Sequence, residues 1–336
     1  MGIPYYFYKL SQKYNNIVSN KKPENTDIYC IDFNGIIHNV AQELIYEKDI
    51  VDVEDKIIEG VWNKILHYID IYKAKKYIIC ADGVAPAAKM SQQRKRRYLS
   101  IYRNVIDDEH ITKKPQWDTN AITPGTQFMN NLNVFINKKI RYSTFPIDII
   151  YSGSNETGEG EHKIFKKLKV ENDYNNIIIN GLDADLIILS LISHKKKIFL
   201  MRETKDRDTG DIIFNYLNID NLKNAILCEV KEKWNMEISY ESYSDIDIIE
   251  TYCTMTSILG NDFIPHLLTI ELKTDGIDKL ISATKISIEQ HGLLIYNGKI
   301  NYNTLKSIFK YLSTTEDNDI HYVCEKYINK RIMGDA

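Results

Sequence analysis

The sequence Asn180-Gly181-Leu182-Asp183-Ala184-Asp185 predicts a junction at which a buried strand stops and a helix begins. The apolar run 177–179 and the Asn-Gly pair after it indicate the strand and its sharp end. Two acids follow, at the carboxyl end of a strand, where open α/β sheets bind their ligands. A single Asp here would be an ordinary helix N-cap, but two acids with one spacer favour a metal site.

Other acids along the chain repeat this arrangement. The strand-like runs 27–32 and 77–82 each end in an acid, and acids also follow the run 147–151. One more acid lies in a Gly-Asn-Asp turn after a predicted helix over 246–259. The full set is Asp32, Asp82, Glu159, Glu161, Asp183, Asp185 and Asp262. Because the carboxyl ends of parallel strands meet at one edge of a sheet, we expect these carboxylates to converge.

Carboxylates gathered in this way repel one another and raise each other's pKa unless cations lie among them. Magnesium is a hard cation that binds oxygen ligands. Two such ions can activate a water molecule and stabilise the leaving oxygen of a phosphodiester. A ligand set without His or Cys indicates Mg²⁺, with Mn²⁺ as a substitute, rather than zinc. For any single acid, a helix cap or a solvated side chain is an equally good explanation.

The bulk composition restricts the class of protein. The chain has 336 residues, 43% of them hydrophobic, which is room for one large α/β domain or two smaller ones. Its formal net charge of −3 excludes a protein that binds nucleic acid through an overall positive charge. Any contact with nucleic acid therefore needs a local basic patch. The five cysteines form no C-x-x-C pair, which favours a reducing compartment. We find no secretory signal and no apolar run of membrane-spanning length, and we expect a cytoplasmic location, with the nucleus also open.

The order of apolar patterns predicts an α/β fold. A strand at 27–32, helical spacing over 55–72 and a strand at 77–82 form a strand–helix–strand unit, which crosses over with right-handed geometry by default. We expect a central, mainly parallel twisted sheet flanked by helices. Residues 1–270 are predicted to form the domain with the metal site, and 271–336 a mainly helical extension packed on it. The pair Thr123-Pro124 predicts the start of a further helix.

A basic segment follows the second of these strands. Lys89, Gln93, Arg96 and Arg97 are spaced i, i+4, i+7 and i+8, so on a helix they share one face. That face could bind a phosphate through charge-assisted hydrogen bonds. A solvated charged face or a nuclear-localisation run is the alternative, and spacing alone does not separate them.

Taken together, the motifs resemble one family. The blocks that carry the resemblance are Asp32-Phe33-Asn34-Gly35-Ile36-Ile37-His38, Asp82-Gly83-Val84-Ala85-Pro86-Ala87-Ala88-Lys89-Met90, Gln92-Gln93-Arg94, Arg96-Arg97, Thr123-Pro124-Gly125-Thr126, Gly158-Glu159-Gly160-Glu161-His162-Lys163, Gly181-Leu182-Asp183-Ala184-Asp185 and Gly260-Asn261-Asp262-Phe263-Ile264-Pro265-His266. The order of these blocks along the chain and the identities of their residues resemble those of the Xrn-type 5′→3′ exoribonucleases, from Met1 to about Ile270.

The resemblance implies a PIN/flap-endonuclease-like fold and degradation of 5′-monophosphorylated single-stranded RNA to mononucleotides with Mg²⁺. It also implies that the family's metal-site acids fall on the seven acids above, with none missing. The family's 5′-phosphate pocket falls on Lys89, Gln93, Arg96 and Arg97, and its base-stacking histidine on His38. A second conserved block of the family follows the first, and we expect it to be absent from this chain.

Three other functions fit parts of the pattern. A haloacid-dehalogenase-like phosphatase also begins with a strand that ends in Asp, but it needs a second Asp at position 34, where this chain has Asn34. A structure-specific DNA flap endonuclease shares the layout of acids. A catalytically weak module that binds RNA ends is the non-enzyme alternative, which the complete set of acids disfavours.

Overall fold

The computed structural model describes residue 3 and residues 5–47, 51–107, 115–143, 147–171, 174, 176–206, 209–236, 243–272 and 275–334. The chain divides into two compact units that alternate along the sequence. Unit 1 comprises Met1–Val18, Asp183–Lys195 and Asn218–Ala336, and unit 2 comprises Ser19–Leu182 and Lys196–Leu217. This division reflects contacts between residues, whereas the expected boundary at residue 270 was based on sequence motifs. That boundary therefore stays a prediction.

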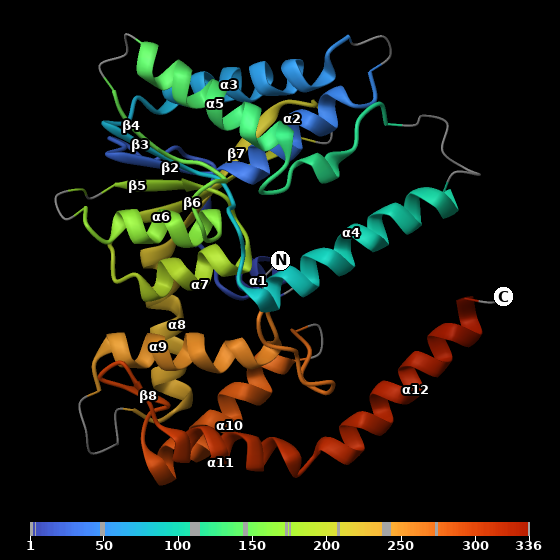
Figure 1. The fold of residues 1–336 in the computed structure, drawn as a ribbon. Coiled ribbons are helices and arrows are strands. Elements are labelled where there is room, and N and C mark those ends of the chain that lie inside the picture. Colours follow the sequence, from blue (N-terminus) through green and yellow to red (C-terminus); the bar gives the residue numbers. More distant parts are fainter. Residues whose placement is uncertain are drawn as a thin grey trace. The chain divides into compact units, whose positions relative to one another are not determined.

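Unit 2 is built on a seven-stranded sheet with the strand order β1-β7-β6-β5-β2-β3-β4 (Figure 1). The strands are β1 (Val18–Ser19), β2 (Ile28–Asp32), β3 (Lys76–Cys80), β4 (Asp148–Ser152), β5 (Ile177–Asn180), β6 (Ile198–Lys205) and β7 (Ile212–Asn218). Strand β2 pairs in parallel with β3 and β5, while β3 pairs in parallel with β4 and β5 with β6. The connection 206–211 suits a hairpin and is too short for a parallel crossover, so β7 runs antiparallel to β6.

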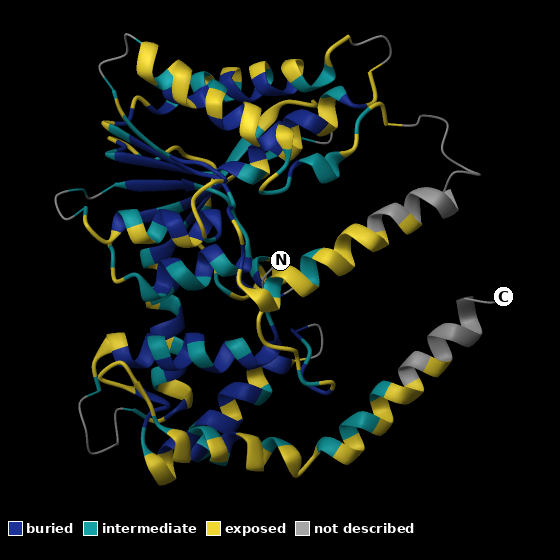
Figure 2. Ribbon diagram, viewed as in Figure 1, coloured by how far each residue is buried: buried dark blue, intermediate teal, exposed yellow. Residues whose placement is uncertain are grey.

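Helices cover both faces of this sheet. On one face lie α2 (Phe33–Leu44), α3 (Val53–Tyr72) and α5 (Gln127–Tyr142), and on the other lies α6 (Gly160–Leu168) (Figure 1). The apolar spacing of α3 buries one side of it, as Figure 2 shows, and β2 and β3 are almost entirely buried because both of their faces are covered. Helix α4 (Ala87–Asp107) is different, since most of its described side chains are exposed.

Unit 1 is mainly helical. It contains α1 (Tyr6–Lys13), α7 (Ala184–Ile192), α8 (Ile219–Lys233), α9 (Asp245–Thr256), η2 (Ser257–Leu259), α10 (Gly276–His291), α11 (Tyr302–Ser313), α12 (Glu316–Gly334) and the hairpin β8 (Ile295–Tyr296) and β9 (Lys299–Ile300). Helix α9 contacts α7, α8, α10 and β8, which explains why it is buried on most sides.

The predicted fold class is confirmed by this parallel sheet, by its flanking helices and by the helical C-terminal part. The helix start at Thr123-Pro124 is wrong by three residues. A 3-10 turn, η1 (Thr119–Ala121), comes first, and α5 begins at Gln127. The hydroxyl of Thr126 accepts a hydrogen bond from Met129 N at 3.3 Å, so Thr126 is the cap. Among the described residues, no helix combines the length and the apolar character needed to span a membrane.

Candidate metal centre and phosphate-binding helix

Asp82 is held in place by Asn34, a residue to which the sequence reasoning assigned no role at the metal site. Asn34 Nδ2 donates to Asp82 Oδ2 at 3.0 Å, and Asp82 N donates to Asn34 Oδ1 at 3.1 Å. Asp82 lies two residues past the end of β3, and Asn34 lies in the first turn of α2. These two bonds fix both the backbone and the carboxylate of Asp82, as outer partners of metal ligands do.

Asp32 and Asp82 meet at the N-terminus of α6. Gly160 N donates to Asp82 Oδ1 at 2.7 Å. A methyl group added at Gly160 would lie 2.9 Å from Asp32 Oδ1 and 3.4 Å from Asp82 Oδ1, so both carboxylates pack against this glycine. Glu159 and Glu161 flank Gly160 in the chain, so four of the predicted acids belong to segments that meet at the start of α6. The N-terminal end of a helix also favours negative charge.

Helix caps do not explain two of these acids. Asp32 occupies the N-cap position of α2 and Glu159 that of α6, yet neither side chain accepts a capping hydrogen bond. Glu159 and Glu161 are 3% and 6% exposed, so their charges are withdrawn from water. Among the described residues, Glu159 Oε1 has no hydrogen-bond partner. A buried carboxylate oxygen without a donor is expensive, and a bound cation would compensate it.

Lys89 compensates part of this charge. Its Nζ donates to Glu159 Oε2, and the two side chains are 12% and 3% exposed. Lys89 was predicted to bind a phosphate, but in this structure it binds a predicted metal ligand. The start of α4 is thereby joined to the start of α6.

The segments that follow β3 and β4 are stabilised by main-chain hydrogen bonds and by a buried lysine. Lys163 Nζ donates to Ala81 O at 2.8 Å and to Gly153 O at 2.9 Å. Burial lowers the pKa of Lys163. Gly83 N donates to Gly158 O at 2.8 Å, and a methyl group at Gly83 would lie only 1.7 Å from Glu156 O, so only glycine fits there. Sequence alone gives no signal for a lysine that is buried against carbonyl groups.

The other residues that were predicted to bind a phosphate also lie on α4. Gln93 is half-buried, whereas Arg96 and Arg97 are exposed. His38 lies on α2, and its pKa is lowered by desolvation and by Arg96, while Asp82 acts in the opposite direction. These influences show that His38 lies within electrostatic range of both the basic helix and the acids. A lowered pKa favours the neutral imidazole.

The other three predicted acids belong to unit 1. Asp183 is the N-cap of α7, and its Oδ1 accepts a hydrogen bond from Leu186 N at 2.8 Å, so the capping role is realised for this residue. Asp185 follows in the first turn of α7. Asp262 is buried and sits in a turn after η2, where Asn261 Oδ1 accepts hydrogen bonds from Phe263 N at 2.9 Å and Ile264 N at 2.8 Å.

The donor set in unit 2 suits a divalent cation. Ligand atoms of Glu159, Glu161 and His162 all lie within 4.8 Å of one another. The carboxylates supply hard oxygen ligands, and Glu159 Oε1 is a buried acceptor without a donor among the described residues. His162 lies beside the two glutamates and adds a ring nitrogen that the sequence reasoning did not count as a ligand.

Comparisons with known proteins agree with the motifs. The family model described as XRN 5′-3′ exonuclease N-terminus matches residues 1–204, and the one described as Xrn1 helical domain matches residues 242–330. The 5′-3′ exoribonuclease 1 of Saccharomyces cerevisiae is 32% identical over 375 aligned residues, which cover 100% of this chain and 24% of that protein. The 5′-3′ exoribonuclease 1 of Homo sapiens is 32% identical over 367 aligned residues, which cover 98% of this chain and 21% of that protein.

This chain therefore spans about a quarter of the length of these curated relatives. Among solved structures, the catalytic core of Rad2 in complex with DNA substrate overlaps with a TM-score of 0.47 at 14% identity, covering 95% of this chain and 81% of that one. An overlap of this extent carries no argument about function.

Proposed function

Because the chain belongs to the XRN 5′-3′ exonuclease family, we propose that it is a Mg²⁺-dependent 5′→3′ exoribonuclease. Its substrate would be 5′-monophosphorylated single-stranded RNA and its products mononucleotides. The observation that carries this proposal is that the Asp32 and Asp82 carboxylates pack against Gly160 at the start of α6, where the neighbouring Glu159 and Glu161 are buried. We also propose a cytoplasmic location, with the nucleus still open.

The proposed metal ligands are the seven acids predicted from the sequence. For Asp32, Asp82, Glu159 and Glu161 the support is their place around the start of α6 in unit 2. For Asp183, Asp185 and Asp262 the support is the family motifs around them. When bound there, Mg²⁺ would activate water and stabilise the charge that develops on the phosphodiester. Mn²⁺ has the same preference for oxygen ligands and is expected to substitute.

The proposed 5′-phosphate site comprises Lys89, Gln93, Arg96 and Arg97 on α4. The exposed guanidinium groups of Arg96 and Arg97 can each bind a phosphate through two parallel hydrogen bonds. Lys89 holds Glu159 in this structure, so its contact with a phosphate requires it to exchange the carboxylate for the phosphate. His38 would stack on the first base as a neutral imidazole.

The test is the release of mononucleotides from three substrates: 5′-phosphorylated RNA, the same RNA with a 5′-hydroxyl, and a labelled DNA flap. We expect Mg²⁺-dependent release from the first and slower release from the second. Preferred cleavage of the DNA flap would instead identify a structure-specific endonuclease. Equal rates on the two RNAs would contradict the phosphate site.

Two substitutions separate the parts of the proposal. Asp183→Ala is expected to abolish turnover while RNA binding survives, and loss of RNA binding would mean that this acid serves folding. Arg97→Ala is expected to lower the preference for a 5′-phosphate about tenfold, because one charge-assisted contact is removed. Arg141→Ala removes an exposed arginine from α5 and is the matched control.

A further inference from the structure

Helix α4 has a second exposed face, which the proposed phosphate site does not use. Tyr98 and Tyr102 are 68% and 63% exposed, although both side chains are large and aromatic. Aromatic residues at helical spacing usually form the buried side of a helix. Here they face solvent, and Figure 2 shows exposed residues along the part of α4 whose side chains are described. Large apolar side chains that are exposed together often mark a binding surface.

This second face lies opposite the proposed phosphate site. Arg94, Tyr98 and Tyr102 are spaced i, i+4 and i+8, so they follow one another on successive turns, and Lys95 lies beside them. Tyr98 comes nine residues after Lys89, which is about two and a half helical turns and places the two on opposite sides of α4. The tyrosine face of α4 therefore comprises Arg94, Lys95, Tyr98 and Tyr102.

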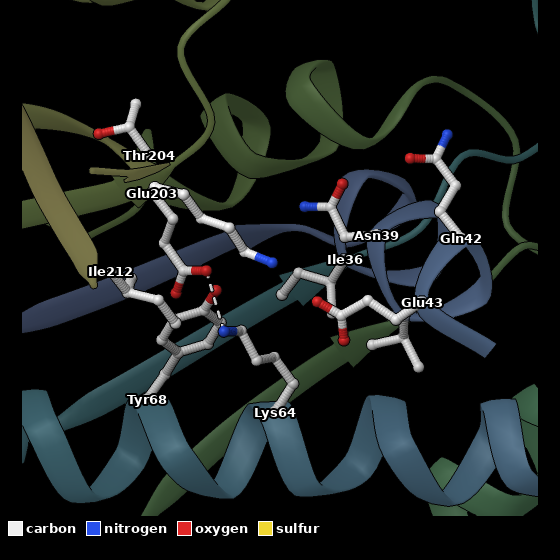
Figure 3. Close-up of a pocket in the computed structure, with 11 residues that line it drawn as sticks. Ile36, Asn39, Gln42, Glu43, Lys64, Tyr68, Glu203, Thr204 and Ile212 are labelled. Atoms are coloured by element: carbon white, nitrogen blue, oxygen red, sulfur yellow. Dashed lines mark ion pairs between the residues drawn. The ribbon is translucent and has the colours of Figure 1, made fainter. Parts of the chain in front are cut away.

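The charge of α4 favours an anionic partner. The helix contains six Lys and Arg residues and a single acid, Asp107, at its last position. Lys64 of α3 is different, since its Nζ pairs with Glu203 Oε2 at 2.9 Å (Figure 3). Among the described residues, no carboxylate forms an ion pair with Arg94 or Lys95, and both side chains are exposed. Because like charges close together destabilise a helix, an anion bound here would stabilise α4.

Aromatic rings among cations suit a single-stranded nucleic acid. Surfaces that bind single strands combine cations that follow the backbone with rings on which the bases stack. Tyr98 and Tyr102 are one turn apart, about 6 Å along the helix axis, so neighbouring bases of one strand can each meet a ring. A protein partner would withdraw the charges of Arg94 and Lys95 from water, which is costly without matching acids.

We propose that the tyrosine face of α4 binds single-stranded RNA outside the 5′-phosphate site. Bases stack on Tyr98 and Tyr102, and backbone phosphates pair with Arg94 and Lys95. This inference rests on the proposed function, because it takes RNA as the substrate. The contact involves neither base edges nor the 5′ end, so it accepts any sequence and also a strand with a 5′-hydroxyl. It keeps the strand on the protein when the 5′ end is not bound.

The experiment measures the affinity of the full chain for an unstructured RNA that carries a fluorescent label at its 3′ end. The RNA has either a 5′-phosphate or a 5′-hydroxyl, and EDTA prevents metal-dependent turnover. Tyr98→Leu keeps an apolar side chain but removes the ring, and it should weaken the binding of both RNAs about tenfold. Tyr98→Phe keeps the ring and should bind both RNAs as the unmodified protein does.

A matched control and two charge variants complete the test. Tyr142→Leu removes a ring that is 72% exposed in the last turn of α5, where Lys139 and Arg141 also lie, and it should have no effect. Arg94→Gln should weaken the binding of both RNAs and make it less dependent on salt, because one phosphate contact is lost. Arg97→Ala lies in the phosphate site and should mainly weaken the binding of the 5′-phosphorylated RNA.

Three results would overturn the proposal. The first is an affinity for both RNAs that is unchanged in Tyr98→Leu, or no binding of either RNA by the unmodified protein. The second is a loss in Tyr98→Leu that is confined to the 5′-phosphorylated RNA, which would assign the ring to the phosphate site. The third is self-association of the chain that Tyr98→Leu abolishes without changing RNA binding, which would identify an interface between copies. A failure of the proposed function would instead appear as no release of mononucleotides in Mg²⁺, while the binding in EDTA remains.

Discussion

Replacing Asn34 by alanine removes both hydrogen bonds that fix Asp82, at 3.0 and 3.1 Å. One of them is donated to a carboxylate, and such bonds contribute about 1.5–3 kcal/mol. Loss of an outer partner of a metal ligand typically weakens metal binding by about 10–100-fold, or about 1.4–2.8 kcal/mol. The two ranges overlap, so we expect Asn34→Ala to weaken Mn²⁺ binding by about 10–100-fold.

The assay is calorimetric titration with Mn²⁺ in the absence of RNA, followed by the Mg²⁺ concentration that gives half-maximal turnover. Asn63→Ala makes the same change at an exposed position of α3 and controls for the loss of an amide from a helix surface. We expect the control to match the unmodified protein in both measurements. If Asn34→Ala also matched the unmodified protein, the position of Asp82 would not depend on Asn34. The assignment of Asp82 as a metal ligand would then lose its structural support.

Two further predictions concern the backbone beneath the acids and the charges of unit 1. Gly83→Ala places a methyl group 1.7 Å from Glu156 O and should lower the stability by at least about 1–3 kcal/mol in urea unfolding, whereas Gly35→Ala meets nothing within 4 Å and should be neutral or stabilising. Equal stability of the two variants would contradict this reasoning. Burial alone would raise the pKa of Glu229, but hydrogen bonds from Lys13, Lys233 and Tyr14 lower it. Glu229→Gln should therefore destabilise the protein by about 1–3 kcal/mol at pH 7.

The effect of Glu229 on stability should depend on pH. Its folded-state pKa is lowered, so its contribution is complete above the unfolded pKa of about 4.3 and is lost as the pH falls through the lower, folded value. Urea unfolding of the two proteins between pH 7 and pH 3 checks this. A difference in stability that stays constant over that range would show that the carboxylate is not held in its ionised form.

Part of the fold follows directly from local sequence. The runs that became β2, β3 and β5 are nearly continuous apolar segments, as expected for parallel strands covered on both faces. The polar residues Asn215 and Asn218 interrupt the pattern in β7, and this strand was not predicted. The start of α5 was misplaced because two Thr residues compete for the cap, and only the contacts of Thr126 decide between them.

Part of the candidate site could also be read from the sequence, since each acid follows a recognisable strand or turn. The residues that hold these acids and the neighbouring main chain in place could not be identified from the sequence. The roles of Asn34 and Lys163 depend on contacts with residues 48 and 82 positions away. Lys89 was assigned to a phosphate because its helical spacing matches that of Arg96, whereas its contact with Glu159 comes from the fold. Long-range contacts of this kind have no local signal.

The central claim is that these buried carboxylates require divalent cations. The most direct measurement is the thermal melting of the full chain with MgCl₂ or with NaCl at matched ionic strength. A ligand present at 100 times its dissociation constant stabilises the folded state by about 2.7 kcal/mol. We predict a higher melting temperature in MgCl₂ and no such gain in Asp82→Asn. A melting temperature that is the same in both salts would contradict the claim.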